Sequence, residues 1–131
     1  MTITGVTYIK VSVVYFVIGV LLGMYMSMAH DYKLTGVHAH VNLLGWASFA
    51  LAGLIYWLFP KAAASMLGKI QFWAHSIGLP IMMIGLAFVL EGKESFEAII
   101  PIGATLVVVS VILFAINVFM NVGPRAGVRK K

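Results

Sequence analysis

The chain has 131 residues, of which 62% are apolar and only 10% are charged, and its mean hydropathy is +1.03. A soluble domain carries about 25% charged residues, so this composition predicts an integral membrane protein with a single domain, residues 1–131. The absence of cysteine excludes disulfides, thiolate metal sites and haem attached through cysteine. The net charge of +5 does not indicate nucleic-acid binding, because the charged residues lie at the ends of apolar segments.

Four uncharged runs follow one another along the chain, at residues 11–29, 41–60, 70–90 and 98–122. A bilayer core is crossed by about 20 apolar helical residues, and a helix satisfies its own backbone hydrogen bonds in lipid. We therefore expect an all-α membrane protein, an antiparallel bundle of four transmembrane helices joined by short loops. The first run is not expected to be a signal peptide, because it lacks a basic leader and a small-residue cleavage site.

Lysine and arginine are divided unevenly between the two sides of this expected bundle. One side holds only Lys33 and Lys93, and the other holds the remaining seven of the nine. Cytoplasmic loops carry an excess of these residues, so both termini are expected in the cytoplasm, in a bacterial inner membrane. The loop with Glu91, Glu94 and Glu97 then lies on the outer side. The seven basic residues are Lys10, Lys61, Lys69, Arg125, Arg129, Lys130 and Lys131.

Three of the four histidines gather where the first two runs meet on the outer side. His30 follows the first run beside Asp31, and His38 and His40 precede the second. Polar groups at membrane depth are usually functional or well partnered, and imidazole is a common ligand of haem and metals. His30 alone is equally well explained as a polar residue at the membrane interface.

His38 and His40 point about 200° apart on a regular helix, so both cannot bind one ion. The face of His38 is polar and small, which is typical of an interior, helix-packing face. The face of His40 is rich in leucine, which is typical of a lipid-facing surface or the wall of a large apolar ligand. Periodicity alone therefore favours His38 as the inward residue. The two faces contain, respectively, Asn42, Gly45, Phe49, Ala52 and Tyr56, and Leu44, Ala47, Leu51, Leu54 and Leu58.

His75 is expected near the inner side of the third run, roughly 24 Å from the outer face at about 1.5 Å per residue. A single haem cannot easily bridge it and the outer histidines within one chain. Its helix face combines Gln71 with small residues, and Asn117 and Asn121 lie at a similar depth and are its expected hydrogen-bond partners. His75 is therefore either a hydrogen-bonded core histidine or a ligand of a second haem or of a subunit interface.

Met24, Met26 and Met28 alternate near the end of the first run. Cu(I) prefers soft ligands, so these thioethers and the neighbouring histidines offer an alternative copper site. On a regular helix the three side chains spread over different faces, so the site requires the helix to unwind near Ser27. Otherwise methionines of this kind fill gaps between helices.

The segment GVHAHVNLLGWASFALAGLIYWLFP, residues 36–60, resembles the second membrane helix of haem–copper oxidase subunit I, particularly in the nitric oxide reductase and C-type oxidase branches. Together with FWAHSIGLPIMMIGLAF, residues 72–88, it more closely resembles small four-helix proteins described as oxidase-subunit-I-like. The resemblance covers roughly the middle half of the chain. It implies that the histidine opening this helix is an axial haem ligand near the outer face. The His-x-Asn-Leu pattern places that role on His40, whereas periodicity favours His38.

The sequence also departs from the large oxidases. Only four helices are expected, so the helices that supply the partner haem ligand and the copper-binding histidines are missing. The resemblance therefore implies no binuclear centre and no complete reduction of oxygen or nitric oxide by this chain alone. A second axial ligand would come from His30, from His38 or from another subunit, or it would be absent and leave a site for a gas.

We therefore expect a membrane protein that binds haem b, with its iron, for electron transfer or for binding or sensing NO or O2. His40 and His38 are the leading ligands, followed by His75 and His30. One alternative is a copper-handling protein that uses the Met/His cluster, and another is a non-catalytic accessory subunit of a respiratory complex. The expected partners are the lipid bilayer and either a second copy or a respiratory complex. No nucleophile–base arrangement or phosphate-binding loop indicates an enzyme.

Overall fold

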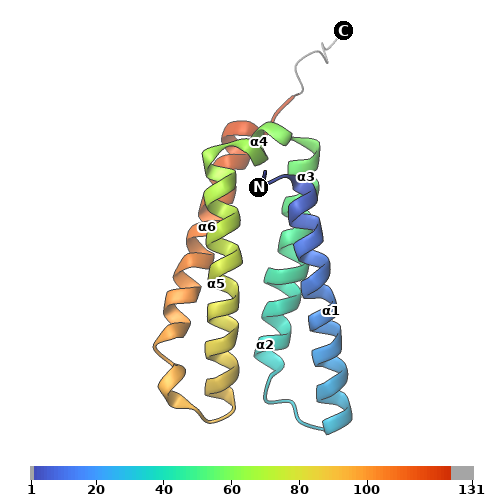
Figure 1. Ribbon diagram of the computed structural model, residues 1–131, viewed down its shortest axis with the longest axis vertical. Coiled ribbons are helices and arrows are strands. Elements are labelled where there is room, and N and C mark those ends of the chain that lie inside the picture. The colour runs from blue at the N-terminus through green and yellow to red at the C-terminus, as the bar shows by residue number, and fades with distance from the viewer. Residues whose placement is uncertain (1, 125–131) are drawn as a thin grey trace.

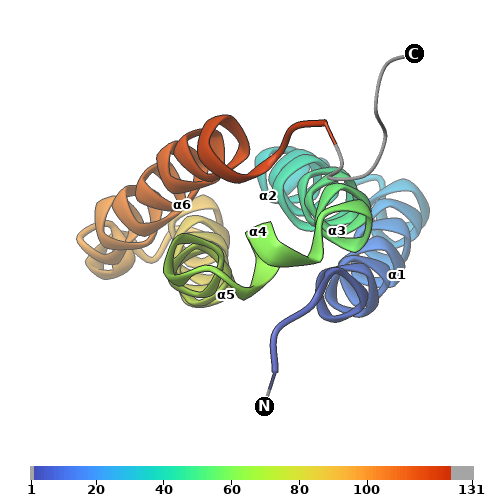
Figure 2. The same ribbon diagram turned by 90° about the horizontal axis from the view of Figure 1, so that it is seen from above.

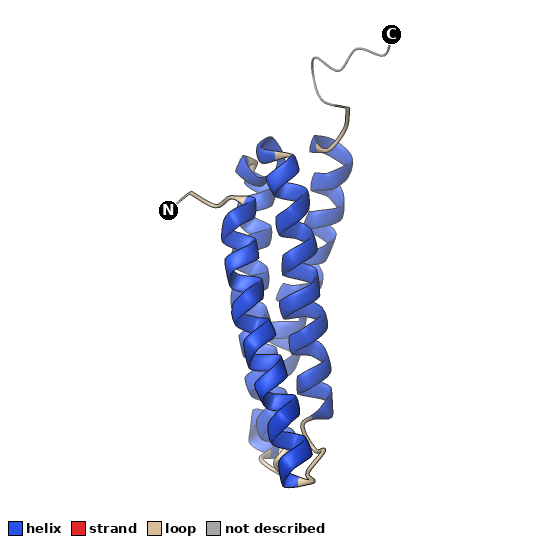
Figure 3. Ribbon diagram, turned by 90° about the vertical axis from the view of Figure 1, so that its right-hand side faces the viewer, coloured by secondary structure: helices blue, strands red, loops and turns tan. Residues whose placement is uncertain are grey.

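The computed structural model describes residues 2–124, and all regular structure in that range is helical (Figure 3). Four helical segments are long and apolar enough to cross a membrane, which indicates an integral membrane protein. The first begins at Gly5 rather than at residue 11, so Lys10 lies inside a helix. The segments are Gly5–Ala29, Thr35–Leu58, Met66–Leu90 and Glu94–Asn121. The basic residues Arg125, Arg129, Lys130 and Lys131 lie outside the described residues.

The second membrane-length segment is a composite of three helical pieces. Its central piece is a π-helix, which is flanked by α-helices. The elements in chain order are α1 (Gly5–Ala29), α2 (Thr35–His40), the π-helix η1 (Val41–Ala47), α3 (Ser48–Leu58), α4 (Pro60–Ala64), α5 (Met66–Leu90), the 3₁₀-helix η2 (Glu94–Phe96) and α6 (Ile99–Asn121).

The helices associate as two pairs. In one pair α1 lies along η1 and α3, and in the other α5 lies along α6 (Figures 1 and 2). Glycines allow the backbones within each pair to approach closely, as is usual between membrane helices. A Cβ atom at Gly45 would lie 2.5 Å from Cγ of Tyr15, and one at Gly103 would contact the backbone nitrogen of Met82. The helix α4 lies at one end of the molecule, and the links 30–34 and 91–98 lie at the other (Figure 1).

The end of α1 is fixed by backbone hydrogen bonds around His30. This residue is left-handed, with φ 49°, and its N–H donates to the carbonyl of Ser27 over 3.4 Å. The N–H of Asp31 donates to the carbonyl of Met26 over 3.1 Å, which completes a Schellman-type helix end. His30 therefore occupies a position that glycine or asparagine usually takes, with its side chain exposed.

Lys33 joins the two links at this end of the molecule. Its Nζ lies 3.5 Å from Oδ2 of Asp31 and 3.4 Å from Oε2 of Glu91. The Asp31 carboxylate, and after it that of Glu91, raises the pKa of Lys33 above its ordinary value. All three groups are exposed or nearly so, and exposed ion pairs contribute little to stability.

The π-helix η1 differs from the regular helix that the sequence predicts. Two side chains donate hydrogen bonds to backbone carbonyls in and around it. Asn42 donates to the carbonyl of His38 over 2.8 Å, and the Ser48 hydroxyl donates to that of Leu43 over 2.7 Å. The Leu43 carbonyl also accepts the backbone N–H of Ser48, five residues on, which is the wider turn of a π-helix. Segments of π-helix are rare and are frequently found at functional sites.

Candidate functional site

His40 is the last residue of α2, immediately before η1. Its Nδ1 lies 2.7 Å from the backbone carbonyl of Gly36. A carbonyl oxygen only accepts, so Nδ1 carries a proton and donates it. In the neutral imidazole Nε2 then keeps a free lone pair, and no hydrogen bond to it is found within residues 2–124. Histidines that bind a metal through one ring nitrogen usually donate the other ring N–H to a carboxylate, a backbone carbonyl or water, as His40 does to Gly36.

An apolar hollow of about 310 Å³ opens beside His40, between η1 and α6. Its volume is at the lower end of the roughly 300–1,000 Å³ of known ligand pockets. His40 and Met82 are the lining residues whose side chains carry atoms able to bind a metal. The other lining residues are Leu44, Ala104, Val107, Val108, Val111 and Ile112. Leu44 agrees with the expectation that the face of His40 forms the wall of an apolar ligand site.

His38 lies on another side of the same helix, against α1. A Cβ atom at Gly23 would lie 2.8 Å from its Cε1, so the ring fills the space that this glycine leaves. Its Nδ1 lies 3.3 Å from Nδ2 of Asn42. The side chain is half-buried, whereas that of His40 is exposed, as the periodicity predicts. The structure therefore does not bring the two leading ligand candidates together.

The inward face of the second membrane-length segment changes at the π-helix. From Gly45 onwards the buried residues match the face predicted for His38, whereas Val37 before the π-helix and Val41 at its first position are buried instead. The extra backbone turn shifts the register, which a regular helical repeat cannot represent. The buried residues from η1 onwards are Val41, Gly45, Phe49, Ala52, Gly53 and Tyr56.

His75 joins the two helix pairs. It is 5% exposed, and its Nε2 lies 2.8 Å from the carbonyl of Leu44 in η1. Its Nδ1 lies 3.2 Å from the hydroxyl of Ser110 in α6, and its ring lies edge-on to Phe49 at 4.4 Å. Both ring nitrogens therefore already have partners within the protein, which is the arrangement of a hydrogen-bonded core histidine.

The expected partners of His75 were wrong. Asn117 donates instead to the Tyr56 hydroxyl and to the Ala62 carbonyl, at 2.8 and 2.9 Å. Asn121 donates to Asn117 over 2.7 Å. Two residues at a similar depth in the membrane need not lie on helix faces that contact each other. Ser110, which is the actual partner, is a hydroxyl residue within the apolar run of α6.

The three methionines near the end of α1 do not converge. Met24 and Met28 are 56% and 74% exposed, whereas Met26 is 5% exposed on another face. The helix continues to Ala29 without the unwinding near Ser27 that a copper site requires. Within residues 2–124 there is also no group of three or more His, Cys, Asp or Glu side chains that could hold a metal.

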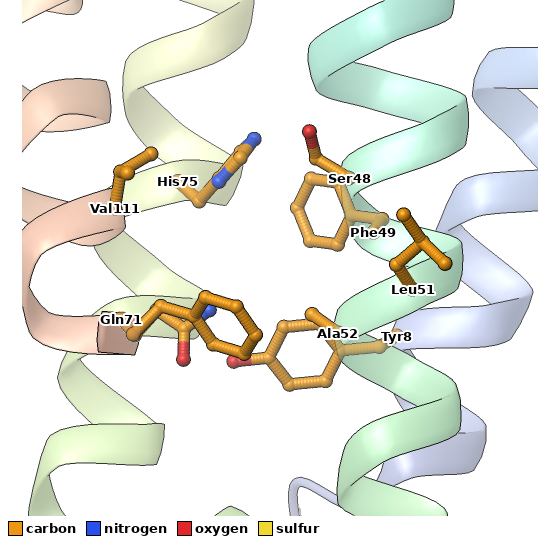
Figure 4. Close-up of a pocket in the computed structure, with 9 residues that line it drawn as sticks. Tyr8, Ser48, Phe49, Leu51, Ala52, Gln71, His75 and Val111 are labelled. Atoms are coloured by element: carbon orange, nitrogen blue, oxygen red, sulfur yellow. The ribbon is translucent and has the colours of Figure 1, made fainter. Parts of the chain in front are cut away.

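A second hollow of about 250 Å³ lies between α3 and the pair α5 and α6 (Figure 4). It shares Val111 with the hollow beside His40. Three of its polar lining residues, Tyr8, Ser48 and Gln71, had no functional role in the sequence analysis. Gln71 is the single glutamine of the chain, and its place within an apolar run was the available signal. The full lining is Tyr8, Ser48, Phe49, Leu51, Ala52, Gln71, His75, Val111 and Phe114.

The chain matches no protein-family model, no curated protein and no solved structure. The likeness to haem–copper oxidase subunit I therefore depends on the sequence motifs of the second and third membrane-length segments alone. A functional assignment must rest on the two hollows and on the polar groups that line them.

Proposed function

We propose that this chain is a membrane protein that binds haem b with His40 as the axial ligand. The observation that carries the proposal is the fixed tautomer of His40. Its Nδ1–H is held by the Gly36 carbonyl, while Nε2 is left free beside an apolar hollow. A haem is a large apolar group, and a free imidazole nitrogen of this kind would bind its iron. When bound it supplies an iron for electron transfer or for binding a diatomic gas.

The chain offers no second imidazole at the same place. His38 lies against α1, and both ring nitrogens of His75 have partners. Met82 lines the hollow, but it is 8% exposed and packs in the core with Val37 and Leu79. A single protein ligand therefore fits the described residues best. A haem iron held by His40 alone would be open to NO or O2, which favours binding or sensing of these gases over electron transfer.

We further propose an antiparallel bundle in a bacterial inner membrane, with both termini in the cytoplasm. Within the described residues, Lys61 and Lys69 belong to the end with α4, and Lys33 and Lys93 belong to the links at the other end. Lys10 lies near the start of α1. The excess of lysine at the end with α4 supports an outer location for the other end, where Asp31, Glu91, Glu94 and Glu97 belong to the links. His40 then lies near the outer face.

The proposal is tested by the absorption spectrum of detergent-purified protein from cells supplied with haem precursor. We expect a Soret band, and a change of the dithionite-reduced spectrum on addition of CO, because one axial position is open. In His40→Ala the band should be lost. His38→Ala is the matched control, since it removes a neighbouring imidazole that faces α1, and it should keep the band.

Two results would overturn the proposal. One is the absence of absorption above the protein band when haem supply is adequate. The other is a Soret band of full intensity in His40→Ala. A reduced spectrum with sharp α and β bands that does not respond to CO would indicate a second ligand. Met82→Leu would then identify whether the thioether supplies it.

A further inference from the structure

The orientation of the Gln71 amide in the second hollow can be worked out from a chain of buried hydrogen bonds that begins at Asn117. Asn117 is fully buried, and its Nδ2 lies 2.9 Å from the Ala62 carbonyl, which only accepts. The nitrogen and oxygen of this amide are therefore not interchangeable. Its Oδ1 accepts from Asn121 over 2.7 Å and faces the Ser65 hydroxyl at 3.1 Å. All four hydrogen-bonding positions of Asn117 are occupied.

The next member of the chain is the hydroxyl of Tyr56. It accepts a hydrogen bond from Asn117 Nδ2 over 2.8 Å, so its own proton must be donated elsewhere. Its other neighbour is Oε1 of Gln71, which accepts that proton. If the Gln71 amide were turned over, the Tyr56 hydroxyl would receive two donors and its proton would have no acceptor. The network therefore requires Oε1 of Gln71 to face Tyr56.

This orientation leaves the amide nitrogen of Gln71 on the side of the hollow. Gln71 is 3% exposed and lines the hollow, yet no hydrogen bond from its Nε2 is found within residues 2–124. Among the described residues, the fully enclosed side-chain atom without a partner is the Ser76 hydroxyl oxygen, so the Gln71 nitrogen keeps some accessible surface. Figure 4 shows Gln71 on the α5 side of the space, across from Ala52 and Leu51 of α3. The hollow thus presents a polarised N–H donor among apolar walls.

We propose that this hollow binds the ring carbonyl of a lipid-soluble quinone through Gln71 Nε2. Phe49 and Phe114 supply flat apolar walls for a ring, and the volume of about 250 Å³ suits one ring system. Leu51 and Val111 are 62% and 49% exposed, so the hollow borders the surface that lipid would cover. A ligand can therefore enter from the bilayer and leave its hydrocarbon tail there.

Phospholipid esters also carry carbonyl groups, but their depth is different. Gln71 and His75 lie about 8 and 14 Å along α5 from its first residue, at about 1.5 Å per residue. A helix of 25 residues is about 38 Å long and extends about 4 Å beyond a hydrocarbon layer of roughly 30 Å at each end, so Gln71 lies about 4 Å and His75 about 10 Å inside the boundary, where the ester groups lie. A ring carbonyl that travels within the hydrocarbon layer therefore matches the position of the donor better.

The test compares menadione with 2-methylnaphthalene, which has the same carbon skeleton without the two carbonyl oxygens. Binding to the full chain in detergent micelles is measured by equilibrium dialysis against empty micelles. We expect menadione to bind about tenfold more tightly, as one added hydrogen bond provides. Its infrared carbonyl stretch should move to lower wavenumber. Equal affinities, or no binding of menadione, would overturn the proposal, and displacement of menadione by added phosphatidylcholine would assign the site to lipid esters instead.

Two variants distinguish the contribution of the Gln71 N–H donor to binding from that of the volume of the hollow. Gln71→Met removes the N–H donors, and Ala52→Leu fills the hollow while leaving the Asn117, Tyr56 and Gln71 network intact. Both should weaken menadione binding about tenfold or more. Ser76→Ala is the matched control on α5, because it removes a buried hydroxyl that has no hydrogen-bond partner within the described residues and does not line the hollow. Unchanged binding in Ala52→Leu would overturn the proposal even if Gln71→Met fails to fold.

The site does not depend on the haem proposal. Menadione binding is measured on haem-free protein, and His40→Ala should bind menadione as the unaltered chain does. A chain that binds menadione and no haem would refute only the proposed function. A chain that binds haem and not menadione would refute only this inference.

Discussion

His40 and His75 both lie next to η1 but differ in how many of their ring nitrogens are hydrogen-bonded. His40 has one nitrogen bonded to the carbonyl of Gly36 and one left free, whereas His75 has both nitrogens bonded, to Leu44 and Ser110. The free nitrogen is available to a ligand, and the two occupied nitrogens hold helices together. Residue type alone gives the same prediction for both, so only the partners distinguish them.

This difference predicts that alanine substitution lowers the free energy of unfolding at His75 but not at His40. His75→Ala removes the donor to the Leu44 carbonyl and leaves a buried acceptor unpaired, so the free energy of unfolding should fall by about 1–3 kcal/mol. The loss is measured by titration with SDS, followed by circular dichroism. His40 is exposed, and its bond to Gly36 lies within one helix, so His40→Ala should change the free energy of unfolding little.

The haem spectrum provides the complementary readout for the same pair. Folded His75→Ala should keep the Soret band that His40→Ala loses. If His75→Ala were as stable as the unaltered chain and also lost the band, His75 would be a ligand and its hydrogen bonds would be incidental.

At the scale of elements, the sequence predicts the four membrane-length helices but not their internal irregularity. Uncharged length marks the spans well, because lipid excludes unpaired backbone groups. The uncharged length places the starts of α1 and α5 too late, because Lys10 and Lys69 lie within these helices near their first residues. The π-helix also contacts residues of other elements, Tyr15 of α1 and His75 of α5, which a local pattern does not contain. The predicted face of His38 is correct only from Gly45 onwards.

The same distinction applies to the candidate site. His40 follows from a sequence motif, and the opposite orientation of His38 follows from helical geometry, because both depend on residues within one helix. The free amide of Gln71 depends on Asn117 and Tyr56, which come from two other helices. Such an arrangement becomes visible only when the three helices are placed together.

The close approach of α1 to η1 gives a prediction at this scale. In Gly45→Ala the added Cβ would lie 2.5 Å from Cγ of Tyr15, so the helices must separate or the ring must move. We expect the free energy of unfolding to fall by about 1–3 kcal/mol, as for other overpacked sites. SDS titration of the purified variant measures this loss.

Gly36→Ala is the matched control for Gly45→Ala. Its Cβ would lie 3.7 Å from Cδ2 of Leu86, which is an ordinary contact, and alanine favours the helix by up to about 1 kcal/mol over glycine. Equal stability, or a gain, is therefore expected there. A similar loss in both variants would show that glycine is needed in this segment for a reason other than the approach of α1.

At the scale of the whole molecule, the two helix pairs meet through side chains more than through close backbones. The contacts between them include the Tyr8 ring against Phe72, the Phe49 ring against His75, and the bonds from Asn117 to Tyr56 and Ala62. Most of these contacts lie towards the end with α4. Both hollows lie at the junction between the pairs, so a ligand in either one contacts both of them.

The proposed orientation of this whole assembly can be tested because the chain has no cysteine. Single cysteines are introduced as Glu94→Cys in η2 and Ala64→Cys in α4, two exposed positions at opposite ends of the molecule (Figure 1). A membrane-impermeant maleimide applied to intact cells should label the first variant, and the second only after permeabilisation. The reverse pattern would invert the orientation and place His40 at the cytoplasmic face. Labelling of both variants in intact cells would contradict the antiparallel arrangement itself, because α5 would then begin and end on the same side of the membrane.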